Sequence, residues 1–160
     1  MRSERLLRLA RPIAVVLAAA LLVDLFLTWR DASIVAGPVD VDAGASGWGG
    51  WGAIAGVFIL VLLVWEVAST LTSRFDARIV ELVGGILCVA ACGLIVVAFF
   101  TGSANVDVAG VVSVVVDERQ WAAYVGLILG LALGVAGALR LFALWSHATL
   151  TTHRPHHGVA

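Results

Sequence analysis

The chain has 160 residues, of which 61% are hydrophobic and only 13% are charged, and its formal net charge is −1. Soluble domains contain about 45–50% apolar and about 25% charged residues. This composition excludes an ordinary soluble enzyme and a disordered chain, and the lack of a basic surplus excludes a nucleic-acid-binding protein. We therefore expect a protein whose main solvent is lipid.

Four stretches are apolar enough to cross about 30 Å of hydrocarbon, which takes roughly 20 residues. They predict spans at about 12–29, 52–72, 79–100 and 121–145, outer loops at 30–51 and 101–120, and a cytoplasmic tail at 146–160. The first span lacks a small-x-small cleavage site, so we expect a retained anchor rather than a signal peptide. The predicted fold is a single all-α transmembrane domain over residues 1–160, a four-helix membrane bundle.

Arginines indicate the orientation of these spans, because cytoplasmic loops are enriched in basic residues. The N-terminal segment carries Arg2, Arg5, Arg8 and Arg11 against one acid, and the link between the second and third spans is also rich in arginine. Both outer loops hold more Asp and Glu than Arg. We therefore expect both termini to be cytoplasmic, with the four N-terminal arginines beside anionic lipid headgroups.

Both outer loops carry strand patterns. Valine and aspartate alternate over residues 39–42, and valine dominates residues 111–116. Such patterns, bounded by glycine, are typical of strands. Because a lone hairpin is marginally stable in water, we predict that strands from both loops pair into one small extracellular β-sheet. Two flexible loops are the alternative.

Small residues recur at four-residue spacing in the predicted spans, which lets helix backbones approach closely in lipid. These residues are Gly52 and Gly56, Gly84, Cys88 and Cys92, and Gly126, Gly130 and Gly134. We expect them to pack the helices of one bundle together, and an interface with another membrane protein or a second copy is the alternative. The two cysteines have no further ligands at their depth, so we expect packing residues and no metal site.

One acidic residue, Asp24, lies near the outer end of the first span. A carboxylate in hydrocarbon costs roughly 2.5–3.5 kcal/mol on insertion scales and usually faces the bundle or a wet cavity. The candidate donors at its depth are Arg119, Gln120 and Tyr124.

Two opposite charges, Glu66 and Arg140, lie in the inner halves of the second and fourth spans. We expect an ion pair that fixes the placement of these two spans, and two separately snorkelling side chains are the alternative. Glu81 lies in the first turn of the third span, where we expect an interfacial residue that complements the helix dipole.

Four tryptophans flank the predicted outer ends of the spans: Trp29, Trp48, Trp51 and Trp121. This placement is typical of an aromatic belt at the membrane interface. The glycines of the string from Gly47 to Gly52 leave the indoles room to lie on headgroups or on a partner.

Residues 24–29 (DLFLTW), 46–52 (SGWGGWG) and 65–66 (WE) resemble small four-span integral membrane proteins common in actinobacteria. This resemblance implies residence in the bacterial plasma membrane and assigns no chemistry. The chain also resembles claudins loosely, in its four spans, inside termini and outer β-sheet, and Trp29 and Gly49–Gly50–Trp51 match part of their first-loop motif. Both cysteines of that motif are missing, so adhesion or paracellular-channel activity is not implied.

Packing features outnumber chemical ones in this sequence, which shows no Ser-His-Asp set and no phosphate-binding glycine loop. We therefore expect a non-enzymatic accessory or scaffolding protein without a cofactor, partnered by the bilayer and by another membrane protein or a second copy. A small transporter or channel that uses Asp24 and Glu66 is one alternative. A lipid-interacting or sensory protein is the other.

Overall fold

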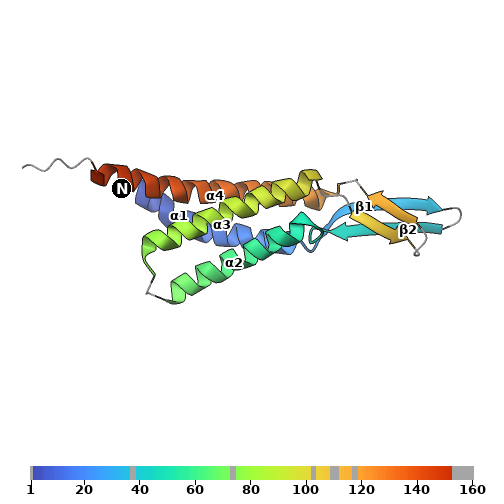
Figure 1. Cartoon of the computed structure of the whole chain (residues 1–160), viewed down its shortest axis with the longest axis horizontal. Helices are drawn as coiled ribbons and strands as arrows, with labels where there is room; N and C mark the ends of the chain where they lie inside the picture. The colour runs from blue at the N-terminus through green and yellow to red at the C-terminus, as the bar shows by residue number, and fades with distance from the viewer. Residues whose placement is uncertain are drawn as a thin grey trace, which may run out of the picture.

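The computed structural model describes residues 2–36, 39–72, 75–101, 104–108, 112–116 and 119–152. In chain order the elements are α1 (Arg2–Asp24), β1 (Thr28–Ala36), β2 (Val39–Ser46), α2 (Trp51–Leu71), α3 (Ala77–Thr101), β3 (Ala104–Val108), β4 (Val112–Val116) and α4 (Trp121–Thr152). The helices lie alongside one another and the strands project from one end (Figure 1).

Helices α2, α3 and α4 are long and apolar enough to cross a membrane. Helices suit this solvent because every backbone polar group must find its partner within the segment. The side chains of α1 are described only from Leu9 onward, and its crossing stays a prediction. α1 ends at Asp24 rather than at the predicted residue 29, because Thr28 and Trp29 already belong to β1, and α4 continues into the predicted tail as far as Thr152.

Each predicted outer loop forms its own antiparallel hairpin. β1 pairs with β2 from Thr28↔Ser46 to Ala36↔Val39, and β3 pairs with β4 from Ala104↔Val116 to Val108↔Val112. The prediction of one joint sheet is therefore wrong: the described strands form two two-stranded sheets. Pairing within a loop closes only a short connection, which costs less chain entropy than pairing between distant loops. The membrane side that the hairpins face stays a prediction.

Small and branched side chains fill the core along the bundle. The fully buried ones include Ala14, Ala18 and Leu21 of α1, Ile59 and Leu62 of α2, Cys88, Ala91 and Ile95 of α3, and Leu133 of α4. Large apolar side chains cover the outside, and Val16, Val64, Ile128 and Phe142 are each 64–68% exposed. An outer surface this apolar fits hydrocarbon rather than water as the neighbour.

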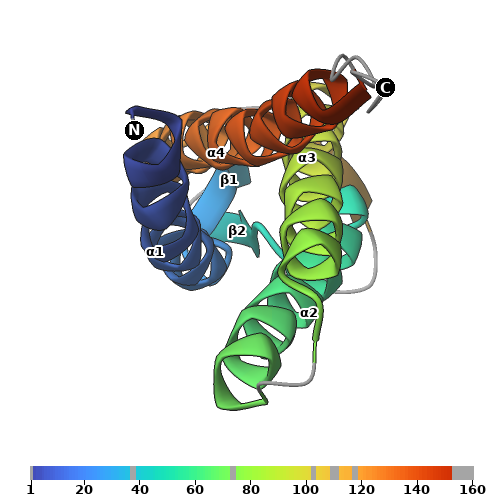
Figure 2. The same ribbon diagram turned by 90° about the vertical axis from the view of Figure 1, so that its left-hand side faces the viewer.

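The four helices are not equally close to one another. α4 packs along both α3 and α1, and α2 packs on α3, whereas α1 and α2 contact each other much less. Seen from the end of the bundle away from the hairpins, α2 leans away from α1 (Figure 2). This asymmetry leaves one side of the bundle open.

Most glycines of the predicted stripe on α4 face α3. A Cβ at Gly130 would lie 2.8 Å from Cγ2 of Ile95, and one at Gly134 would lie 2.6 Å from Sγ of Cys92. One turn further, a Cβ at Gly137 would lie 2.6 Å from Cβ of Cys88 and 2.8 Å from the backbone oxygen of Gly85. These small residues, including both cysteines, therefore pack α3 against α4 within one chain.

The glycines of α2 face the segment that precedes the helix. A Cβ at Gly56 would lie 2.7 Å from Cη2 of Trp48, and one at Gly52 would collide with the backbone oxygen of Gly47. Trp48 also lies against Phe26, with ring centroids 5.3 Å apart. These two glycines therefore let the chain turn tightly into α2.

We expect Gly137→Ala to destabilise the bundle by about 1–3 kcal/mol, because the new methyl group meets a backbone carbonyl that moves only if α3 moves. Gly93→Ala is the matched control, since a Cβ at Gly93 has no described atom within 4 Å. Alanine there should leave stability unchanged or raise it by up to about 1 kcal/mol. Unfolding in mixed micelles, followed by circular dichroism, measures both. Equal stability of the two variants would contradict the close α3–α4 contact.

Candidate functional site

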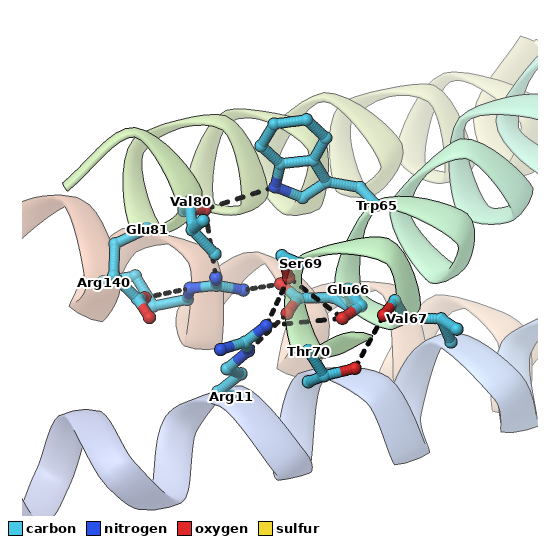
Figure 3. A network of polar contacts seen from close by, with 9 residues as sticks. All are labelled: Arg11, Trp65, Glu66, Val67, Ser69, Thr70, Val80, Glu81 and Arg140. Atoms are coloured by element: carbon cyan, nitrogen blue, oxygen red, sulfur yellow. Dashed lines mark hydrogen bonds and ion pairs between the residues drawn. The ribbon is translucent and has the colours of Figure 1, made fainter. Parts of the chain in front are cut away.

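Four charged side chains, one from each helix, meet in a network of polar contacts (Figure 3). Their positions along the helices place them toward the end of the bundle away from the hairpins. They are Arg11 of α1, Glu66 of α2, Glu81 of α3 and Arg140 of α4. We refer to these four residues as the charge cluster.

Glu66 lies at the centre of the charge cluster and binds two arginines. Its Oε1 accepts from Nη1 of Arg140 and its Oε2 accepts from Nε of Arg11, both at 2.6 Å. Arg140 also donates from Nε to Oε2 of Glu81 at 2.6 Å. The charges thus alternate in sign from Arg11 through Glu66 and Arg140 to Glu81, and their formal sum is zero.

Burial separates the inner pair of the cluster from its ends. The side chains of Arg140 and Glu66 are 0% and 2% exposed, whereas those of Glu81 and Arg11 are 20% and 29% exposed. Removing an ion from water costs several kcal/mol, so a buried ion is tolerated only with near-complete pairing. The inner pair therefore depends on contributions from all four helices.

Neighbouring backbone completes the environment of Arg140. Its Nη2 donates to the carbonyl of Val80 at 3.4 Å, which also accepts from Nε1 of Trp65 at 3.4 Å. A Cβ at Gly84 would lie 2.7 Å from Cζ of Arg140, so the guanidinium fits because position 84 has no side chain. Gly84, which we expected to bring two helices together, thus makes room for the guanidinium of Arg140.

Arg11 has its own set of acceptors on α2. Besides Oε2 of Glu66, it reaches the carbonyl of Glu66 from Nη2 at 3.3 Å and the hydroxyl of Ser69. Glu66 and Ser69 are three residues apart and therefore lie on the same face of α2. This spacing places both side chains beside the guanidinium of Arg11.

The predicted pair of Glu66 and Arg140 is confirmed. Two of its neighbours have partners that were not predicted from the sequence, because Arg11 binds Glu66 and Glu81 binds Arg140. The positions of Arg11 beside headgroups and of Glu81 at the interface stay predictions. The sequence signal for these two contacts is that opposite charges lie near the same end of different spans. Arg11 directly precedes the predicted span 12–29 and Glu81 is the third residue of the predicted span 79–100, so each lies near the same end of the bundle as an opposite charge on another helix.

Asp24 is buried at the other end of α1, with no bond to the predicted Arg119. Its Oδ2 accepts from Nε1 of Trp29 at 3.0 Å, and Oδ1 accepts no hydrogen bond from a described residue. The indole folds back over the helix end into space that Gly126 leaves open, since a Cβ there would lie 2.5 Å from Oδ2 of Asp24. Trp29 is consequently 4% exposed, which corrects its predicted interfacial position.

The predicted belt residues differ in their surroundings. Trp51 and Trp121 are 48% and 66% exposed, as an interfacial belt requires. Trp48 is turned onto Gly56 and Phe26, and its Nε1 is buried without a partner among the described residues.

Two arginines fasten the hairpins to α3. Arg119 donates from Nε to the carbonyl of Phe99 at 3.1 Å, and Arg30 donates from Nη2 to the same oxygen at 3.3 Å. The guanidinium of Arg119 also lies 4.9 Å from the ring centroid of Phe99. This carbonyl belongs to the last turn of α3, where cations suit the helix dipole. We call these three residues the hairpin junction.

Backbone contacts also hold the two hairpins together at the junction. An isolated antiparallel bridge joins Arg30 to Arg119, and the N–H of Gln120 donates to the carbonyl of Trp29 at 2.8 Å. The start of β1 and the residues before α4 are thus fixed to each other and to the end of α3.

No protein-family model, curated protein or solved structure matches this chain. The resemblances to small actinobacterial four-span proteins and to claudins remain predictions, and the function is argued from the residues themselves.

We expect Glu66→Gln to destabilise the protein by about 3–5 kcal/mol, because Arg140 and Arg11 both lose a charged acceptor inside the bundle. Glu81→Gln should cost only about 1 kcal/mol, since Glu81 is partly exposed and Arg140 keeps Glu66. Unfolding by sodium dodecyl sulfate in mixed micelles gives both values. Equal losses in the two variants would contradict the central place of Glu66 in the charge cluster.

Proposed function

We propose that the protein is a non-enzymatic accessory or scaffolding protein of the bacterial plasma membrane that holds its two hairpins in a fixed position for a partner. The partner is another membrane protein or a second copy of the chain, and both termini lie in the cytoplasm. The observation that supports this proposal most directly is the hairpin junction, where Arg30 and Arg119 share the carbonyl of Phe99.

A fixed junction suits recognition because a partner that binds a preordered surface does not have to order it first. The hairpins extend along the bundle axis beyond the helix ends (Figure 1). Their bases are held by the last turn of α3 and by the residues that enter α4. A bundle built in this way presents its strands in one direction.

The chemistry within the helices also favours a structural role. The charges of the cluster bind one another, and the glycines of α4 face Asp24, Ile95 and Cys92 of the same chain. The hairpin end, with the exposed Trp51 and Trp121 beside it, is then the natural surface for a partner.

Transport by way of Asp24 and Glu66 has less support. Asp24 and Arg11, which binds Glu66, are thirteen residues apart on α1, about 20 Å along the helix. The buried side chains described between these two levels are apolar, including Ala18, Ile59 and Leu133. They offer no chain of polar groups for a proton or an ion.

Photo-cross-linking in native cells tests the proposed contact surface. A photoreactive amino acid at Val41 in β2 or Val114 in β4 should give adducts with a membrane protein or a second copy. The control position is Leu131 on α4, which is 48% exposed on the helical surface. Adducts from Leu131 with none from either hairpin would contradict the proposal.

The junction itself is tested by Arg119→Ala. Losing the hydrogen bond to Phe99 should destabilise the ordered position of the hairpins by about 1 kcal/mol, which is about a factor of five in its population. Cross-linking from Val41 should therefore fall about fivefold, while the helices stay folded. Arg78→Ala, in the first turn of α3, is the matched control and should leave the yield unchanged. An unchanged yield in Arg119→Ala would show that the junction does not position the hairpins for the partner.

A further inference from the structure

A groove opens on the side of the bundle where α1 and α2 diverge. Its volume is about 440 Å³, and its walls are Pro12, Val15 and Val16 of α1 and Val67 and Thr70 of α2. One end of the groove is formed by the ion pair of Arg11 and Glu66. A groove with apolar walls and a cation at one end suits a lipid, because the walls can contact an acyl chain and the cation can contact the headgroup.

Arg11 has donor capacity left at this end of the groove. Nε and Nη2 donate to Glu66 and Ser69, whereas Nη1 has no hydrogen-bond partner among the described residues (Figure 3). The side chain of Arg11 is 29% exposed. A guanidinium donor at a membrane surface suits a phosphate oxygen, which forms short charge-assisted hydrogen bonds.

The groove lies at the right depth for a headgroup. Glu66 is five residues before Leu71, the last residue of α2, which is about 8 Å along the helix. A helix of 21 residues matches the thickness of the hydrocarbon region. The Arg11 end is therefore within reach of the glycerol and phosphate groups, and the apolar walls face acyl chains.

We infer that this groove binds one anionic phospholipid from the leaflet at the end of the bundle away from the hairpins. One acyl chain lies against Val15, Val16 and Val67, and a phosphate oxygen accepts from Nη1 of Arg11. The open donor of Arg11 favours this occupant over an apolar helix, because Nη1 needs an acceptor that a phosphate oxygen supplies and an apolar helix does not.

The experiment is native mass spectrometry of the full chain, released from nanodiscs that contain equal amounts of phosphatidylglycerol and phosphatidylcholine. The unmodified protein should retain one phosphatidylglycerol in preference to phosphatidylcholine, by about fivefold for a single arginine near the surface. Arg11→Gln should abolish this preference. Equal retention of the two lipids by the unmodified protein would overturn the inference.

Val16→Trp tests the groove without touching the charge cluster. The indole should fill the channel and lower phosphatidylglycerol retention about fivefold. Val135→Trp is the matched control, because Val135 is 61% exposed on α4 and lies outside the groove. Equal retention in the two tryptophan variants, with circular dichroism showing both folded, would overturn the inference even if Arg11→Gln failed to fold.

Adding inorganic phosphate to the nanodiscs distinguishes a lipid from a free anion. Phosphatidylglycerol should stay bound, since the acyl chain contributes to its affinity. Displacement by millimolar phosphate would show that the site binds free phosphate and would overturn the lipid assignment.

Discussion

One buried carboxylate holds the helical half of this molecule together. Glu66 carries a single charge but gives each of its oxygens to a different arginine, one from the first helix and one from the last. Glu81 then supplies the second acceptor that Arg140 needs. Replacing such a set by apolar residues of similar volume often costs nothing, so we attribute its value to specificity, because the observed placement of the four apolar helices pairs every charge of the cluster.

The two ends of the bundle use arginine in different ways. At one end, Arg11 and Arg140 meet carboxylates, and the contact lies between helices. At the other end, Arg30 and Arg119 meet a backbone carbonyl, and the contact joins hairpins to a helix. The chain contains no lysine. The planar fork of arginine suits both tasks, because it donates in several directions at once and always keeps its charge.

Hydropathy alone predicts α2 and α3 to within two residues and the start of α4, because apolar runs of that length have few alternative structures. It ends α4 too early, at residue 145 instead of Thr152. It overestimates the first span at Trp29, since Asp24 and the strand-forming residues that follow end the helix earlier. The valine patterns predict strands correctly, but pairing between loops is a tertiary choice that alternation does not encode.

The sequence predicts only part of the candidate site. Opposite charges in the inner parts of two spans indicate the pair of Glu66 and Arg140, because an arginine side chain is long enough to reach across a difference in depth. The positions of Arg11 and Glu81 near span ends predict an interfacial role and do not reveal which charges these residues contact. The fold of Trp29 over Asp24 depends on the missing side chain of Gly126, a relation between distant segments that no local pattern reveals.

The order in which the charged residues occur along the chain bears on how such a protein is made. Ribosomes deliver Arg11 first and Glu66 next, so the first two helices carry a matched pair before the others exist. Arg140, the most deeply buried cation of the cluster, is translated after Glu66 and Glu81, the two carboxylates that it contacts. Biosynthesis from the N-terminus thus brings the guanidinium of Arg140 to the membrane after both of its carboxylate partners.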